Sequence, residues 1–359
     1  MSNVKAALVL EDGTTFEGVA FGHVGEAFGE TVFYTGVVGY QEVITDPSYR
    51  RMLAVLTYPI IGAYGVNGED DESPAALVSG VIVREYSPYY SNWRATGSLE
   101  DYLKARGVVG IREVDTRAVA VHLREHGEMR GVIASGDFDA KKLAATVKDT
   151  PSPLAEDLVR DITREEVRKP RGRAKRRLVA IDLGIKRSLL EQLADLGAAV
   201  EIVRCTADAK DILARKPHGI LVAGGPGDPR RLPHVADTVR ALLGKAPVLG
   251  IGLGHQALAL ALGCRIRRMK IGHRGVNYPV RDLVDGTSHI TAQSHSFVVD
   301  AKGIPKSVEV THTNQNDGTV EGIRCRKVAA WGVQFHPGRD EMERPSTVLE
   351  AFTKGPKRR

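Results

Sequence analysis

The stretch Val248-Leu-Gly-Ile-Gly-Leu-Gly-His-Gln256 joins a short apolar segment to a helical one through alternating glycines. Glycines on either side of a central residue allow a sharp bend, which projects that residue over the N-terminus of the following helix. Such an elbow normally carries a nucleophile, but the residue at its apex is Gly252, which has no side chain. The stretch predicts a strand–elbow–helix unit without the reactive group.

Similar units flank this stretch and decide the fold of the second half of the chain. Short apolar strands are predicted at 178–183, 200–205, 219–222 and 248–251, and helices at 187–196, 207–215, 235–243 and 255–262. Because near-continuous apolar strands alternate with helices, we expect a parallel sheet covered by helices on both faces. From Ile290 to Phe335 the pattern returns to alternating strands.

Ligands of such sheets bind at the carboxyl ends of the strands, so the loops there are the candidate site. One loop is Ala223-Gly-Gly-Pro-Gly-Asp-Pro229, in which three glycines and two prolines favour a rigid turn. Its backbone amides are available to a ligand. A plain tight turn is the alternative, but the length and glycine density favour a functional loop.

The elbow also satisfies a dinucleotide-binding pattern, Gly252-x-Gly254-x-x-Ala257. That fingerprint needs an acidic residue about 20 positions further on to hold the ribose. The segment 267–278 contains no Asp or Glu, and the pattern follows the fourth strand of the series rather than the first. A nicotinamide-dependent enzyme is therefore disfavoured.

The first half mixes strands and helices without regular alternation, which indicates an α+β domain. A hairpin is predicted over 5–20 with its turn at Asp12-Gly13, further strands at 30–36, 52–58 and 76–84, and helices at 98–106 and 116–126. The segment 163–177 contains a basic run and is predicted to be an exposed linker.

Composition narrows the class of protein. With 359 residues, 42% hydrophobic and 26% charged, the chain is long enough for two globular domains. The net charge of +6 is concentrated in 168–177 and the last residues, without interleaved aromatics, so no nucleic-acid partner is expected. Three cysteines without CxxC spacing favour a reducing compartment, and no segment suggests a membrane span or signal peptide. We expect a cytoplasmic protein.

Motifs of one family run through both halves of the chain. The first half contains Gly39-Tyr-Gln-Glu42, Thr45-Asp-Pro-Ser-Tyr49, Asp115-Thr-Arg117 and Met129-Arg-Gly131, and the second Gly225-Pro-Gly-Asp-Pro229, Leu253-Gly-His-Gln256, Gly272-His-Arg-Gly275 and Gln334-Phe-His-Pro337. Together they resemble the small, glutamine amidotransferase subunit of carbamoyl-phosphate synthase. The resemblance implies a small-subunit domain over 1–155, a basic linker over 156–177, and a class I glutamine amidotransferase domain with a flavodoxin-like parallel sheet over 178–355.

The resemblance also implies a chemistry. In this family a Cys thiolate attacks the glutamine side-chain amide, a His paired with Glu moves the proton, and ammonia passes to a large subunit. That partner makes carbamoyl phosphate from bicarbonate and ATP for arginine and pyrimidine synthesis, so ATP and divalent metal are expected there, and no cofactor or metal in this chain. The corresponding positions are Gly252 for the nucleophile, His336 for the histidine, Gly338 for the acid, Gly225 and Leu253 for the oxyanion hole, and Ser48, Gly227, Gln256, Ser294, Ser296 and Phe297 for glutamine.

The chain departs from the family at several of these positions. Gly252 replaces the Cys and Gly338 the Glu, while Ser294 and Ser296 stand where Asn and Gly are usual. Neither Cys205, Cys264 nor Cys325 is a credible substitute nucleophile. If the family glycine has a positive φ, Ser296 is expected to be strained. We expect an impaired or dead glutaminase, and structural roles for His255 and His295.

Two hypotheses follow from these departures. In the first, the chain is a small subunit by descent that forms a heterodimer with the large subunit, which then uses free ammonia. In the second, it is a regulatory pseudo-amidotransferase that senses glutamine and docks on the large subunit without catalysing hydrolysis.

Overall fold

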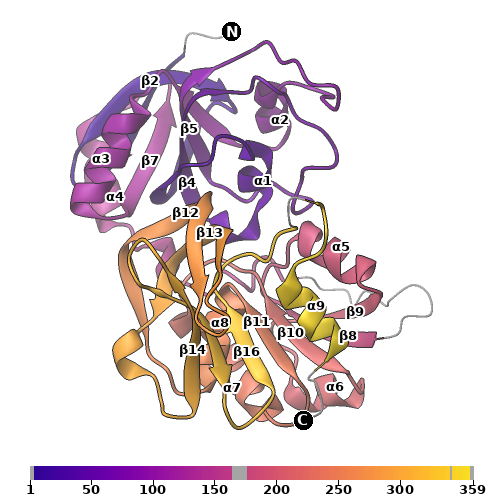
Figure 1. Cartoon of the computed structure of the whole chain (residues 1–359). Helices are drawn as coiled ribbons and strands as arrows, with labels where there is room; N and C mark the ends of the chain where they lie inside the picture. The colour runs from indigo at the N-terminus through magenta and orange to yellow at the C-terminus, as the bar shows by residue number, and fades with distance from the viewer. Residues whose placement is uncertain (1–3, 164–175, 340–341, 356–359) are drawn as a thin grey trace. The chain divides into compact units, whose positions relative to one another are not determined.

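The structure, a computed structural model, describes residues 4–163, 176–339 and 342–355, and these pack into two units (Figure 1). Unit 1 comprises Met1–Glu156 together with Lys270–Arg274, and unit 2 comprises Asp157–Met269 and Gly275–Arg359. The basic run of the predicted linker falls mostly in 164–175, outside the described residues.

Unit 1 is built on a closed barrel with the strand order β1-β2-β6-β5-β4-β3-β7. The strands are β1 (Lys5–Leu10), β2 (Thr15–Gly22), β3 (Glu26–Tyr34), β4 (Met52–Ile61), β5 (Gly80–Tyr86), β6 (Val109–Arg112) and β7 (Met129–Ser135). The predicted hairpin is confirmed, since β1 and β2 pair antiparallel with Leu8 opposite Phe16. The pairs β3–β4, β4–β5 and β5–β6 are parallel, so the barrel is mixed.

The helices of unit 1 are α1 (Tyr40–Thr45), α2 (Leu99–Ala105), α3 (Thr116–His126) and α4 (Ala140–Asp149), with short 3-10 turns η1 (Pro47–Tyr49) and η2 (Pro153–Ala155). The two predicted helices, α2 and α3, are confirmed. Their starts follow from side-chain caps, because Ser98 Oγ accepts from the amide of Asp101 at 3.1 Å and Asp115 Oδ1 accepts from Ala118 at 2.9 Å. Gly127 ends α3 with a φ of 99°.

Unit 2 contains a nine-stranded sheet with the order β13-β12-β14-β15-β16-β11-β10-β8-β9. Its strands are β8 (Arg176–Asp182), β9 (Ala198–Arg204), β10 (Gly219–Ala223), β11 (Val248–Ile251), β12 (Ile266–Asp282), β13 (Ser288–Val299), β14 (Val308–Asn314), β15 (Val320–Cys325) and β16 (Ala330–Val333). The neighbours from β16 to β9 are parallel, as predicted, whereas β14 and β15 pair antiparallel.

Helices cover both faces of the parallel part of this sheet (Figure 1). They are α5 (Arg187–Asp195), α6 (Ala209–Ala214), α7 (Pro233–Leu242), α8 (Leu253–Ala261) and α9 (Thr347–Lys354), with 3-10 turns η3 (Pro229–Arg231) and η4 (Ala301–Gly303). One core joins the sheet to α6, α7 and α8, and the other joins it to α5 and α9. The prediction of a doubly covered parallel sheet is confirmed. No helix within the described residues combines the length and hydropathy that crossing a membrane requires.

A short part of β12 packs in unit 1 rather than with the rest of its strand. Arg274 is only 1% exposed and forms an ion pair with Glu128, whose Oε1 also accepts from the amide of Gly272 at 2.8 Å. A charge this deeply buried is tolerated only when it is paired and hydrogen-bonded, as it is here. The sequence pattern did not predict this segment of unit 1.

Candidate active site

The parallel register of unit 2 brings three loops to one edge of the sheet. Ala223 at the end of β10 pairs with Ile251 at the end of β11, and Ile251 pairs in turn with Val333 at the end of β16. The loop after β10, the elbow after β11 and the segment after β16 therefore begin at the same level on three adjacent strands. The candidate site predicted from the sequence lies at this carboxyl edge.

The elbow has the backbone of a nucleophile-bearing turn and lacks only the side chain. Gly252 has φ 60° and ψ −119° and precedes α8 directly. Its amide donates to the Val333 carbonyl at 3.0 Å, and its carbonyl accepts from the amide of Gln256 at 3.2 Å. A Cβ added at Gly252 would meet only the carbonyl oxygen of Gln334, at 3.9 Å. Gly252 therefore combines a backbone conformation that would strain any other residue with open space for a side chain above it.

The predicted oxyanion pair is brought together. Gly225 has φ 110°, and a Cβ added to it would lie 2.5 Å from the carbonyl oxygen of Leu183, so only glycine fits here. The same Cβ would lie 2.6 Å from Cδ2 of Leu253, so the two residues are neighbours. Leu253 is the first residue of α8, so no carbonyl within the helix can reach its amide. The sequence predicted that this helix starts at His255, but α8 begins two residues earlier, at Leu253. The geometry places Gly225 and the positive N-terminal end of α8 beside the elbow.

Gln256 links the helix to the other side of the site. Its Nε2 donates to the Phe297 carbonyl at 2.6 Å and to Oε1 of Gln334 at 2.9 Å. The predicted residues Gln256 and Phe297 are thus in contact. Gln334 was missed as a site residue, although it stands in the quoted motif Gln334-Phe-His-Pro337; only its contact in the fold reveals it.

The loop that contains Gly227 is fixed by an ion pair. Oδ2 of Asp228 lies 2.7 Å from Nη2 of Arg230, and the Arg230 guanidinium carbon lies 5.4 Å from the centre of the Phe297 ring. Gly227 has φ 91°, a conformation that favours glycine. Arg230 is a second contact that sequence reasoning missed, because nothing in the pattern indicated that η3 approaches β13.

The two serines stand on β13. Ser296 is buried and Ser294 is half-buried, with an Oγ that has no hydrogen-bond partner among the described residues. The prediction of strain at Ser296 is wrong: it belongs to the extended strand and is absent from the positive-φ residues of the described chain. A serine is accommodated here without backbone cost.

His336 and Gly338 follow β16. The His336 amide donates to the Ala292 carbonyl at 2.9 Å, so the backbone of this residue is tied to β13, and its side chain is half-buried. Gly338 is exposed, and a Cβ added to it would meet nothing within 4 Å. The acid position therefore has room for a larger side chain.

Ser48 belongs to unit 1, in η1. It is 7% exposed, and its amide donates to Asp46 Oδ1 at 2.8 Å, which starts the turn. The structure thus places Ser48 in a defined 3-10 turn of unit 1.

The cysteines of unit 2 are poorly suited to act as a nucleophile at the elbow. Burial raises the pKa of Cys264, which follows the far end of α8, to about 11, and burial also raises the pKa of Cys205. Cys325 ends β15, which runs antiparallel to β16 with Arg324 opposite Trp331, so it lies toward the amino edge of the parallel strands. Neither position nor ionisation favours a substitute nucleophile.

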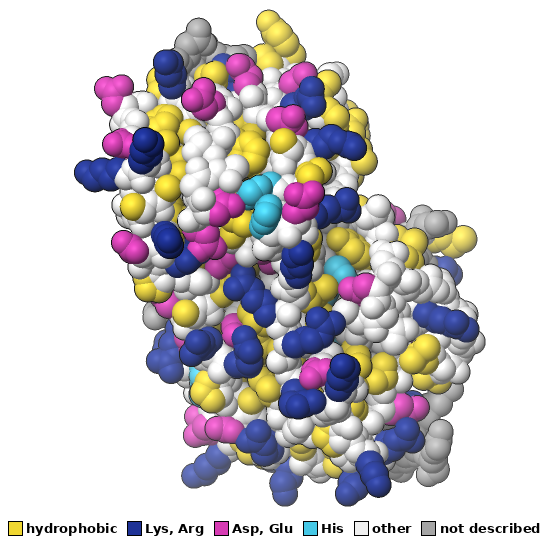
Figure 2. All heavy atoms as spheres, turned by 90° about the vertical axis from the view of Figure 1, so that its left-hand side faces the viewer, with side chains coloured by type: hydrophobic (Ala, Val, Ile, Leu, Met, Phe, Trp, Pro, Cys, Tyr) yellow, Lys and Arg dark blue, Asp and Glu magenta, His cyan; other side chains and the backbone are white. Residues whose placement is uncertain are grey.

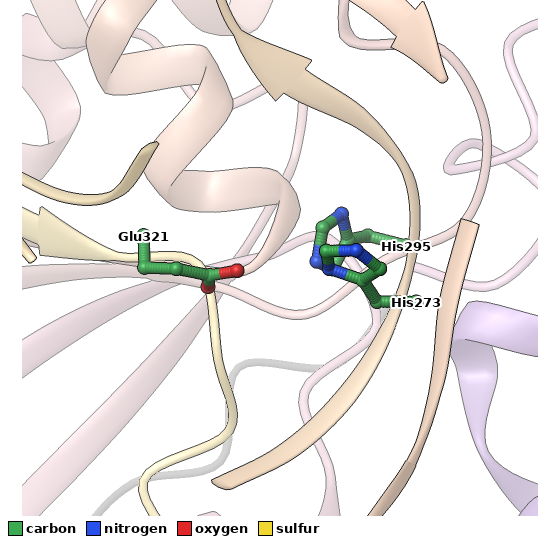
Figure 3. Close-up of side chains that lie close together, drawn as sticks. All are labelled: His273, His295 and Glu321. Carbon is green, nitrogen blue, oxygen red and sulfur yellow. The ribbon is translucent and has the colours of Figure 1, made fainter. Parts of the chain in front are cut away.

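Two buried side chains of unit 2, His295 on β13 and Glu321 on β15, lie close together in Figure 3. One ligand atom of each lies within 4.8 Å of the other. Both ring nitrogens of His295 already face acceptors, the Phe297 carbonyl at 3.0 Å and Gln293 Oε1 at 2.6 Å. These two contacts tie the His295 ring to its own strand.

Comparison with known proteins matches both units to known families. The family model for the carbamoyl-phosphate synthase small chain, CPSase domain, matches residues 8–133, and that for the class-I glutamine amidotransferase matches residues 179–354. The chain is 43% identical to the carbamoyl phosphate synthase small chain of Syntrophotalea carbinolica, with 93% of each covered. It is 44% identical to that of Akkermansia muciniphila, over 93% of this chain and 92% of the relative. A solved glutamine amidotransferase of Thermotoga maritima is 20% identical, covering 46% of this chain and 76% of its own, with a TM-score of 0.36.

Proposed function

The chain belongs to the carbamoyl-phosphate synthase small-chain family, and from this premise we propose that it is a small subunit whose own glutaminase is lost. In this proposal it assembles with a large subunit in the cytoplasm as a heterodimer. The large subunit binds ATP and a divalent metal and makes carbamoyl phosphate from free ammonia, for arginine and pyrimidine synthesis.

The observation that supports the proposal is the bare apex of the elbow. Covalent hydrolysis of an amide needs a group that attacks the carbonyl carbon, and Gly252 offers only hydrogen at that point. Loss of the nucleophile alone typically costs several orders of magnitude in rate, on the order of 10⁶ in a well-studied hydrolase. The remaining parts of the site cannot compensate, because they stabilise charge that forms only after the attack.

The acid–base side of the site is weakened as well. A histidine base is normally held and charge-stabilised by a carboxylate, and Gly338 provides none at the family position. This loss is secondary, since triad losses do not add once the nucleophile is absent. The His336 amide donates to the Ala292 carbonyl, so the backbone of this residue is held independently of an acid at residue 338.

The parts of the pocket built by the backbone are retained. In this proposal the amides of Gly225 and Leu253, with the positive end of α8, still donate hydrogen bonds to the oxygen of a side-chain amide, and Gln256 is held by two hydrogen bonds. Intact glutamine is therefore a possible ligand that is bound and not consumed.

The test uses this chain co-purified with the large subunit from the same genome. Carbamoyl-phosphate formation is compared from glutamine and from ammonium chloride at equal nitrogen. The proposal predicts ammonia-dependent synthesis by a stable complex, with glutamine supporting no more than background. Comparable rates from both nitrogen sources would refute it. If the chain instead binds glutamine and lowers the activity of the large subunit, the regulatory hypothesis replaces the first.

A further inference from the structure

Two histidines on the surface of unit 1 are placed as neighbours by α3. His122 and His126 are four residues apart, so their side chains leave the same face of the helix. Their ring centres lie 4.5 Å apart with an angle of 39° between the planes. Their side chains are 19% and 55% exposed, so solvent reaches both. Figure 2 shows histidine side chains next to one another on the face it presents, with acidic side chains close by.

Asp12 orients the first of these rings from the β1–β2 turn. Its Oδ2 lies 2.6 Å from Nε2 of His122, and the edge of the same imidazole meets Phe16, with ring centres 6.4 Å apart. A carboxylate on one ring nitrogen fixes the tautomer and leaves the lone pair of the other nitrogen available.

The charges around the pair favour a cation. Glu125 lies 4.0 Å from Nε2 of His126 and is 67% exposed, which adds a second carboxylate beside Asp12. Glu11, the other acid of the turn, is taken by its ion pair with Arg130. Arg124 lies two residues from each histidine along α3 and so points away from their shared face.

We propose that His122 and His126 bind a divalent late transition metal ion, Zn²⁺ or a similar ion, with water completing its coordination. Two imidazole nitrogens spaced four residues apart on a helix are a recurrent ligand pair for zinc, and nitrogen donors select such ions over Mg²⁺ and Ca²⁺. Asp12 acts as the orienting carboxylate behind His122, so the bound ion couples the last turn of α3 to the β1–β2 hairpin. This site is independent of the glutaminase pocket.

The test measures Zn²⁺ binding by calorimetry to the full chain without a histidine tag, after metals have been removed with a chelator. We expect His122→Gln and His126→Gln each to weaken binding about a hundredfold, and Asp12→Asn about tenfold. The substitutions are on the surface, and glutamine suits a helix, so folding should be unaffected. Zn²⁺ should raise the melting temperature of the unchanged chain and not that of His126→Gln.

Two control variants locate the ion. His23→Gln changes another exposed histidine of unit 1 and should bind like the unchanged chain. His295→Gln removes a buried histidine of unit 2 and should also have no effect. Unchanged affinity in His122→Gln and His126→Gln, or loss of binding in His295→Gln instead, would overturn the proposal.

Discussion

The loop after β10 and the elbow after β11 lie on adjacent strands, yet they differ in whether backbone or side chain supplies the chemistry expected of them. In the loop, the expected chemistry belongs to backbone amides. Gly224 and Gly225 are needed there because a Cβ at either position would collide with a backbone carbonyl oxygen of a neighbouring segment. At the elbow the backbone is equally specialised, but the chemistry of a nucleophile belongs to a side chain, and Gly252 has none. A group supplied by the backbone persists as long as the fold does, whereas one supplied by a side chain can disappear while the fold remains.

The largest expected effect comes from placing a nucleophile at residue 252 and an acid at residue 338. In Gly252→Cys/Gly338→Glu, glutamate release from glutamine should rise about a thousandfold or more above the unchanged chain, because a nucleophile and its acid return to a preserved backbone. Both positions have room, since an added Cβ meets nothing closer than 3.9 Å at Gly252 and nothing within 4 Å at Gly338. A coupled assay of glutamate measures the rate.

Gly338→Glu alone is the matched control and should stay at background, because it supplies no nucleophile. Activity in this single variant would point to an attacking group other than residue 252. A folded but inactive double variant would mean that other changes in the pocket, such as Ser294 and Ser296, matter more than the elbow.

The second effect compares the two glycine positions by stability. A Cβ added at Gly224 would lie 1.9 Å from the carbonyl oxygen of Gly184, whereas one added at Gly252 meets only the oxygen at 3.9 Å. We expect Gly224→Ala to lower the free energy of unfolding by more than about 4 kcal/mol, and Gly252→Ala by about 1–2 kcal/mol from its positive φ alone. Urea unfolding of both variants measures the difference. Equal losses would remove the contrast between the two regions.

The third effect concerns the charge at the start of α8. Complete burial lowers the pKa of His255 to about 3, so the folded state keeps this imidazole neutral and the backbone amides alone make the helix end positive. The unfolded chain has an imidazole pKa of about 6.5 and binds the extra proton first. The free energy of unfolding should therefore decrease as the pH is lowered, by up to about 1.4 kcal/mol per pH unit between about pH 6.5 and pH 3.

His255→Leu should flatten this pH dependence, measured by urea unfolding at a series of pH values, and the exposed His289→Gln should leave it unchanged. A slope that persists in His255→Leu would show that His255 does not cause it.

The smallest effect is expected at Ser296, where the substitution falls on a regular strand. Because the residue is extended and unstrained, Ser296→Gly should destabilise the protein by about 0.5–1 kcal/mol through the greater flexibility of glycine. Thermal unfolding measures whether Ser296→Gly lowers or raises the stability of the protein. A stabilising Ser296→Gly would reveal strain that the extended backbone does not explain.

The sequence was most informative where local signals are strong. α3 has its predicted bounds because Asp115 and Gly127 determine its ends locally, and β11 because a short apolar run meets a glycine elbow. The packing of Lys270–Arg274 in unit 1 and the contacts of Gln334 and Arg230 were not predicted, because they depend on partners distant in sequence. The expected strain at Ser296 was wrong because it assumed a φ that the extended strand does not have.

The most direct test of the central claim asks whether any residue of the pocket attacks a substrate. The chain is incubated with an electrophilic glutamine analogue that alkylates a pocket nucleophile, and the intact mass and peptides are measured, with Gly252→Cys as the positive control. We predict an adduct at residue 252 in the variant and none in the unchanged chain. A glutamine-protected adduct on any residue of the unchanged chain would contradict the loss of the nucleophile.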